Sequence, residues 1–141
     1  IDLLLCDIAV GNNQITLNGE EFNNQTYSNF NTENFASVMV FDEGDMTFYD
    51  TQIHSSGSDG SINVSLVDCT TVGTFESYIY ITLDQVGTLY MQNATTIITK
   101  FGSIGQLVEG TFTGIANYND EAITISGSFS VIRHPDEHHG W

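Results

Sequence analysis

The stretch GTFTGIANYNDEAITISGSFSVI, residues 110–132, decides the fold class. Two runs within it alternate apolar residues with small polar residues, and the polar segment NYNDEA lies between them. An alternation with a period of two places one set of side chains on a buried face of a sheet and the other set on a solvated face. This pattern is typical of two antiparallel strands that are joined as a hairpin.

The alternation also predicts a register for this hairpin. We expect Phe112 to face Phe129. Gly114 then faces Gly127, and residues 119–122 form the loop. Because glycine inside a strand marks a bend, a bulge or a close approach of another group, the paired glycines predict a gap in the apolar face. Either a large side chain of the opposing sheet fills this gap or a small ligand occupies it.

The same alternation recurs along the chain, and helical periodicity is nearly absent. β-branched and aromatic residues fill short segments between turn sequences such as DEGD (42–45) and SSGSDGS (55–61). We therefore expect one domain over residues 1–133, with about ten short strands packed as an antiparallel β-sandwich or, alternatively, as a flattened β-barrel. The expected strands are 3–10, 14–18, 37–42, 46–53, 61–67, 76–83, 87–91, 95–101, 106–117 and 122–132.

Two segments fall outside this strand pattern. Residues 23–36 are polar with scattered aromatic residues, and we expect a long loop there with room for one helical turn at 31–36. Residues 134–141 are rich in histidine and contain Pro135, which interrupts strand pairing. We expect this segment to be an exposed C-terminal tail.

The charge balance excludes several classes of partner. Lys100 and Arg133 are the only basic residues, against 18 Asp and Glu residues, and the formal net charge is −16. Such a chain repels phosphate backbones and anionic lipids, so we expect no direct binding to nucleic acid. No apolar run reaches the roughly 18 residues that a membrane-spanning helix needs, so we expect no direct membrane insertion. High acidity keeps a protein soluble or suits surroundings in which ions screen its charge.

The two cysteines suggest an oxidising compartment. An even number of cysteines in a chain rich in Asn, Thr, Ser and Gly favours one disulfide, between Cys6 and Cys69. The alternative is two buried thiols that do not pair.

Four segments between residues 78 and 133 carry a resemblance: YIYITLDQVGTLYM, TTIITKF, LVEGTFTGIA and EAITISGSFSVIR. Together they resemble the closing strands of small β domains in secreted proteins and lipoproteins of Bacteroidota. The segment ITLNGEEF, residues 15–22, is similar to the opening strand of such domains. The resemblance implies an envelope or extracellular location, and it carries over no catalytic residue.

We predict no catalytic residue and no enzymatic activity. A hydrolase needs an activated nucleophile or two carboxylates held across a cleft. The sequence contains neither a GxSxG elbow nor a glycine-rich phosphate loop, and His54 stands alone in a turn-like segment.

Two sets of residues suit metal ions, and calcium is the one cofactor that we consider. The acidic loops supply the oxygen ligands that Ca²⁺ prefers, at Asp42, Glu43, Asp45, Asp59 and Asp120. The tail supplies imidazoles, which bind zinc, copper or nickel, at His134, His138 and His139. Solvated turns and a solvated tail are the simpler interpretations of both sets.

The function that we expect is that of a non-catalytic structural or interaction domain that is extracellular or lies at the cell surface, on the exterior of the outer membrane. Such a domain is an adhesin module, a filament subunit or an accessory subunit of an outer-membrane complex, and it binds a protein partner or its own copies. The apolar segment IDLLL, residues 1–5, either forms the first strand of the domain or adds to a neighbour's sheet. The alternative function is a binding module for a glycan or another small ligand, with or without calcium, through Tyr78, Tyr80 and Trp141.

Overall fold

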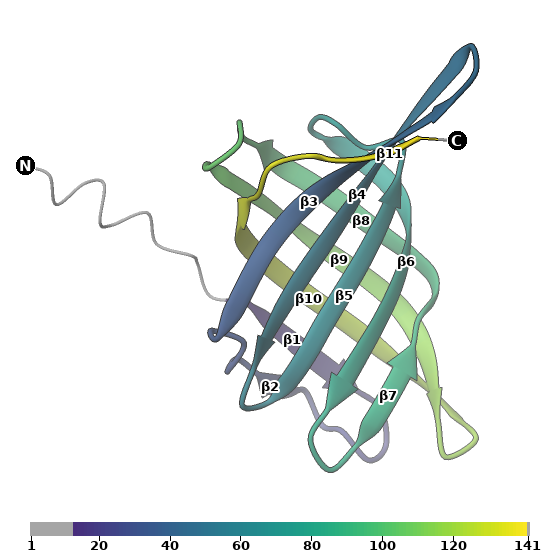
Figure 1. The fold of residues 1–141 in the computed structure, drawn as a ribbon. Coiled ribbons are helices and arrows are strands. Elements are labelled where there is room, and N and C mark those ends of the chain that lie inside the picture. Colours follow the sequence, from purple (N-terminus) through teal and green to yellow (C-terminus); the bar gives the residue numbers. More distant parts are fainter. Residues whose placement is uncertain (1–12, 141) are drawn as a thin grey trace, which may run out of the picture.

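The computed structural model describes residues 13–140, and it describes side chains up to His138. Every regular element in this range is a β-strand (Figure 1). The strands are β1 (Gln14–Asn18), β2 (Gln25–Tyr27), β3 (Glu33–Glu43), β4 (Met46–Gly57), β5 (Gly60–Val67), β6 (Gly73–Leu83), β7 (Gly87–Tyr90), β8 (Gln92–Phe101), β9 (Leu107–Tyr118), β10 (Glu121–Arg133) and β11 (Glu137–Gly140). The all-β prediction is confirmed. The strand expected at 3–10, which includes part of IDLLL, lies outside the described residues.

The strands form one continuous mixed sheet that folds over into two layers. Its order is β11-β3-β4-β5-β6-β8-β9-β10-β1-β2, and β7 adds to β6. β3 runs parallel to β11 and, over two register positions, parallel to β10, whereas the other pairings are antiparallel. In Figure 1, β3 to β7 lie in front and β9, β10 and β1 lie behind them. The arrangement is consistent with the predicted β-sandwich, and the short β3–β10 pairing joins its layers along one side.

The core consists of the inward-facing half of each alternating strand. Ile62, Val64 and Leu66 of β5 are buried, and so are the inward-facing Ile79 and Ile81 of β6. Complete burial of such a side chain stabilises the fold by about 1.5–3 kcal/mol relative to exposure. A shift of one residue in the pairing register of a strand would turn its apolar side chains toward water. Burial of these side chains therefore determines which residues of each strand face outward. In the described part of the chain there is no helix long and apolar enough to cross a membrane.

The hairpin of residues 110–132 forms β9 and β10, but its predicted register is wrong. Phe112 lies opposite Gly127 and not opposite Phe129. The pairing is thus displaced by two residues from the prediction. Because side chains alternate with a period of two, this displacement leaves every residue on its expected face.

The turn explains the displacement. Tyr118 pairs with Glu121, so Asn119 and Asp120 alone connect the strands, and the predicted loop at 119–122 is too long. Both connecting residues have positive φ, of 50° and 63°. This is the backbone of a type I′ turn, which is favoured in hairpins because its twist matches that of the flanking strands.

Large side chains occupy the space at both glycines of this hairpin. A Cβ atom at Gly127 would lie 2.3 Å from Cζ of Phe112, and one at Gly114 would lie 2.6 Å from Cε of Met91. The gap that we expected in the apolar face is therefore closed. At Gly127 the space is filled by Phe112 of the neighbouring strand β9. At Gly114 it is filled by Met91, which lies between β7 and β8.

Residues 23–36 are not the long loop that we predicted. They contain β2 and the start of β3, and the helical turn expected at 31–36 is wrong. Phe35 and Ala36 pair with β4 on one side and with β10 on the other. Pairing on both sides supplies hydrogen-bond partners for the backbone of this segment in an extended conformation.

The histidine-rich tail also pairs with the sheet. Residues 137–140 form β11, which runs parallel to residues 39–42 of β3. Pro135 lies in the gap between β10 and β11, where proline was expected to interrupt pairing. The side chains of His134, Glu137 and His138 are exposed.

Candidate functional site

A row of residues crosses the outer face of the front layer from β3 to β7. The register places one residue of each strand opposite the next, namely Phe35, His54, Asn63, Tyr80 and Tyr90. Directly opposed side chains on neighbouring strands lie on the same face and within contact distance. We call these five residues the aromatic row.

Contacts at the β3 end hold the aromatic row in place. Nδ1 of His54 lies 2.8 Å from Oδ1 of Asn63, and Nε2 of His54 lies 3.3 Å from Oε1 of Glu33. The ring of His134 stacks on Phe35 with centroids 4.9 Å apart and an angle of 12° between the planes. Since both nitrogens of His54 face these two partners, the imidazole is not placed as the base of a Ser-His arrangement.

A second row runs beside the first and is mostly polar. Ser37, Gln52, Ser65 and Tyr78 lie opposite one another in turn on β3, β4, β5 and β6. Nε2 of Gln52 donates a hydrogen bond of 2.5 Å to Oγ of Ser65. We call these four residues the polar row, and the two rows together the binding face.

Three tyrosines give the binding face its exposed aromatic surface. Tyr78 is 72% exposed, Tyr90 70% and Tyr80 46%. The rings of Tyr80 and Tyr90 lie 6.0 Å apart. Aromatic side chains usually supply their large area to a core or to an interface, so three exposed rings on one face indicate an interaction surface.

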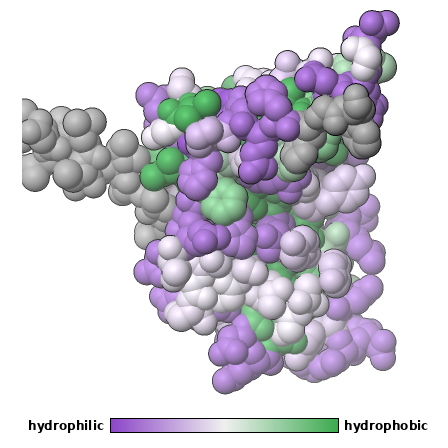
Figure 2. All heavy atoms as spheres, in the orientation of Figure 1, coloured by the Kyte–Doolittle hydropathy of each residue, from purple (hydrophilic) through white to green (hydrophobic). Residues whose placement is uncertain are grey.

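The binding face carries no carboxylate, although the chain has a net charge of −16. Its nine residues supply aromatic rings, hydroxyls, two amides and one imidazole. The carboxylates next to it belong to Glu33, Glu76, Asp136 and Glu137. Figure 2 views the front layer and shows pale residues of intermediate hydropathy over its middle and lower part, with strongly hydrophilic residues around them. The two rows themselves are therefore free of carboxylates on a strongly acidic molecule, and the carboxylates lie at their border.

One hollow lies at the β6 end of the polar row. β6 pairs with β8 up to Ser77 and with β7 from Tyr80 onward, while β8 changes register between Gln92 and Thr95. Asn93, inside this bulge, has a φ of 53°. The resulting hollow has a volume of about 400 Å³ and is lined by Glu76, Ser77, Tyr78, Met91, Gln92, Asn93, Ala94 and Thr95. We call it the bulge hollow.

A second hollow lies at the β3 end of the polar row. Its volume is about 510 Å³, and it is lined by Phe35, Ser37, Met39, Gln52, His134, Pro135, Asp136 and Glu137. Ser37 is 7% exposed, and its hydroxyl oxygen has no hydrogen-bond partner among the described residues. Arg133 and Asp136 form an ion pair of 3.0 Å in the segment that leads to β11. We call this second hollow the edge hollow.

The structure does not bring the predicted metal ligands together. Asp42, Glu43 and Asp45 lie at the β3–β4 tip, where Oδ1 of Asp42 accepts a hydrogen bond from Thr47. Asp59 accepts hydrogen bonds from the backbone N–H groups of Ser28 and Asn29, so it holds a loop. The other predicted ligands with described side chains are Asp120, His134 and His138. The described residues contain no group of three or more His, Cys, Asp or Glu side chains placed to hold a metal ion, and the side chain of His139 lies outside them.

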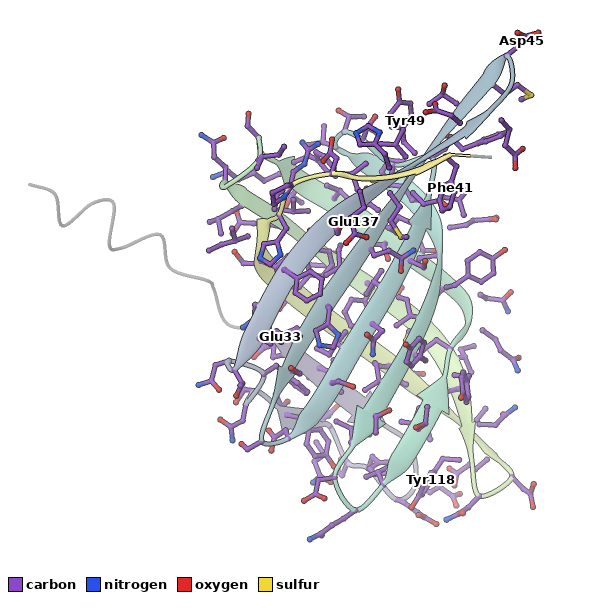
Figure 3. All side chains as sticks on the ribbon, in the orientation of Figure 1. Glu33, Phe41, Asp45, Tyr49, Tyr118 and Glu137 are labelled. Carbon is purple, nitrogen blue, oxygen red and sulfur yellow. The ribbon has the colours of Figure 1, made fainter. Side chains whose placement is uncertain are left out.

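The β3–β4 hairpin forms a second exposed feature, because it projects beyond the rest of the sheet. Figure 3 shows Asp45 at its far tip, with Phe41 and Tyr49 nearer its base. The pairing of β4 with β5 ends at Asp50, so residues 46–49 are paired only with β3 in the described part of the chain. Met46 is 58% exposed and Tyr49 41%. This edge is open to a further strand.

The structure describes one of the two cysteines, Cys69. Cys69 is fully buried and is a free thiol in the structure, while Cys6 lies outside the described residues. Burial raises the pKa of the Cys69 thiol, and the hydrogen bonds with Thr71 and Thr51 oppose this rise. The Cys6–Cys69 disulfide remains a prediction.

Two of the three predicted ligand-binding residues, Tyr78 and Tyr80, lie together on the binding face, and Trp141 lies outside the described residues. No sequence pattern predicts that Tyr90, His54 and Asn63 lie in line with Tyr80. The alternation in YIYIT places two tyrosines on one face, but only the pairing of β5, β6 and β7 shows what lies beside them. Comparisons with protein-family models, curated proteins and solved structures found no match.

Proposed function

We propose that this chain is a non-catalytic binding domain that takes a neutral glycan on its binding face. The observation that carries the proposal is the set of exposed rings of Tyr78, Tyr80 and Tyr90 beside uncharged hydroxyl and amide side chains. It favours a glycan-binding module over a structural domain.

The chemistry of the face suits a sugar ring. The C–H face of a pyranose packs on an aromatic ring, and its equatorial hydroxyls donate and accept hydrogen bonds at the rim. The amides of Gln52 and Asn63, with the hydroxyl of Ser65, supply both kinds of group beside the tyrosines. Aromatic anchors with a few placed polar groups are the usual composition of a ligand site.

The negative charge of the chain favours a neutral glycan over an anionic one. The field of a chain with a net charge of −16 repels anionic sugars such as uronates and sulfated chains. Neither row contains Lys or Arg, and the charge of Arg133, near the edge hollow, is paired with Asp136. A neutral glycan meets no such barrier. A location outside the cell, where such glycans are accessible, stays part of the proposal and rests on the acidic composition and the resemblance described above.

Electrophoresis in gels that contain a polysaccharide tests the proposal. We expect xylan, galactomannan, mixed-linkage β-glucan or starch to retard the protein, and polygalacturonate to leave its mobility unchanged. Tyr78→Ala and Tyr80→Ala should abolish the retardation. Tyr49→Ala is the matched control, because it removes an exposed tyrosine from the projecting hairpin. If no neutral polysaccharide retards the protein, or if Tyr49→Ala has the same effect as Tyr78→Ala, the proposal is wrong.

The projecting hairpin supports a second candidate function, association with a protein strand. The open edge at residues 46–49 can accept an added strand. A depression of about 270 Å³ lies beside it and is lined by Phe41, Phe48 and Val67 together with Glu43 and Asp50. The acidic residues at the tip oppose contact between two copies, so self-association should appear only at high salt. Light scattering at low and high salt tests this candidate, and a monomer that persists at high salt removes self-assembly through the hairpin.

A further inference from the structure

We infer that the binding face holds an extended oligosaccharide that crosses the strands along the polar row, with one end in the bulge hollow and the other toward the edge hollow. The inference rests on the proposed function, and it adds the length and direction of the ligand and the residues that hold its end.

The polar row connects the two hollows. Ser37, its first residue, lines the edge hollow, and Tyr78, its last residue, lines the bulge hollow. Gln52 and Ser65 lie between them in register. The row crosses four strands, which at a spacing of about 4.8 Å makes a path of roughly 14 Å. Each sugar unit lengthens a linear glycan by about the distance between neighbouring strands, so successive units can meet successive strands.

The bulge hollow is suited to the end of the chain. Bulges are frequent beside functional sites because they interrupt pairing and redirect side chains. Here the bulge at Asn93 places its amide, that of Gln92 and the carboxylate of Glu76 around one opening next to Tyr78. Within the described residues, no hydrogen bond engages the side chains of Glu76, Gln92 or Asn93, and all three side chains are exposed.

These groups complement a sugar unit. A carboxylate accepts two hydrogen bonds from adjacent hydroxyls, and an amide both donates and accepts. Hydrogen bonds to a charged group are the stronger kind. The volume of about 400 Å³ lies within the range of small-molecule sites. The carboxylate also repels an anionic unit, in agreement with the preference for neutral glycans.

The edge hollow has a different composition. The stacked rings of Phe35 and His134 line it together with the carboxylates of Asp136 and Glu137. Ser37 also lines it, and its hydroxyl has no hydrogen-bond partner among the described residues. A buried hydroxyl without a partner is unfavourable, and a ligand hydroxyl that enters the hollow would supply one. Both hollows contain carboxylates, but the bulge hollow adds two amide side chains, Gln92 and Asn93, and the edge hollow adds stacked rings. The two ends of the path are thus not equivalent, so the ligand should bind in one direction.

Calorimetric titration with oligosaccharides of two lengths tests the inference. The probes are xylohexaose, mannohexaose, cellohexaose and maltohexaose, each compared with its disaccharide. We expect at least one hexasaccharide to bind about tenfold or more tightly than its disaccharide, since only the longer chain spans the path. Glu76→Gln keeps the size of the side chain, removes its charge and should weaken hexasaccharide binding about tenfold, which corresponds to the loss of one charge-assisted hydrogen bond. Gln92→Ala should act in the same direction.

Glu43→Gln, at the exposed hairpin tip, is the matched control for the loss of one negative charge and should leave binding unchanged. If hexasaccharide and disaccharide bind equally, or if Glu76→Gln and Gln92→Ala bind the hexasaccharide as the original chain does, the path is wrong. In that case the proposed function stands as long as Tyr78→Ala still abolishes binding. If no hexasaccharide and no neutral polysaccharide binds, the proposed function fails and the path fails with it.

Discussion

Tyr80 of β6 lies directly opposite Tyr90 of β7, and the centroids of their exposed rings are 6.0 Å apart. β7 is a strand of four residues that pairs with β6 just beyond the point where β8 leaves it. This short strand therefore adds an aromatic ring to the outer face, while its Leu89 packs in the core. The same local change of partner opens the bulge hollow, so one irregularity of the sheet produces both the aromatic pair and the hollow beside it.

Replacing either member of this pair should affect binding more than stability. We expect Tyr80→Ala and Tyr90→Ala each to lower the free energy of unfolding by less than about 1 kcal/mol, the range for an exposed cross-strand pair. Each should weaken binding to the neutral polysaccharide about tenfold or more, because aromatic anchors dominate such contacts. Urea unfolding and gel retardation measure the two effects. A loss of several kcal/mol in stability with unchanged binding would assign the pair a structural role.

The sequence predicted much of the fold and less of the candidate site. Alternation identified the strands and the outward face of Tyr78 and Tyr80, because burial of one face demands a period of two. It could not show that His54 and Asn63 lie in line with Tyr80. Those neighbours depend on turns and registers between distant segments, and local pattern does not determine them.

The hairpin of residues 110–132 illustrates this limit. Both the predicted and the observed register keep the apolar residues on one face, so hydrophobic pattern does not distinguish them. The choice depends on whether Asn119 and Asp120 adopt left-handed backbone, which asparagine and aspartate tolerate. At residues 33–36 the polar composition predicted a loop, but the segment is a strand. Its pairing with β4 and β10, which are distant in sequence, determines this conformation.

The two core glycines of the hairpin should respond differently to alanine. At Gly127 the added Cβ would lie 2.3 Å from the Phe112 ring and 2.9 Å from the carbonyl oxygen of Gln14, and neither group can move easily. We expect Gly127→Ala to cost about 1–3 kcal/mol. At Gly114 the nearest atom is the flexible end of Met91, at 2.6 Å, so Gly114→Ala should cost less. Urea unfolding of both variants compares them, and the reverse order would contradict the packing described.

The β9–β10 turn offers a stabilising substitution. Asp120 has a φ of 63°, and glycine adopts this backbone without steric cost. Asn-Gly is also the favoured sequence of a type I′ turn. We expect Asp120→Gly to raise the free energy of unfolding by up to about 1 kcal/mol, and Asp120→Ala to lower it. Thermal unfolding of the two variants measures this, and a lower melting temperature for Asp120→Gly would argue against a type I′ turn.

When Cys69 is a free thiol, as in the structure, alkaline pH should destabilise the fold through it. Burial raises the pKa of its thiol, so the folded state holds this proton more tightly than the unfolded state does. The stability contributed by the neutral thiol is therefore complete below the unfolded pKa of about 8.5 and is lost as pH rises through the folded pKa. Tyr27, whose pKa is raised first by burial and then by Asp59, acts in the same direction near its own higher pKa. Urea unfolding across the alkaline range should show falling stability, with a smaller fall in Cys69→Ala than in the original chain. An equal fall in Cys69→Ala would assign the effect to other groups, and Tyr27→Phe would then show whether the phenol is responsible.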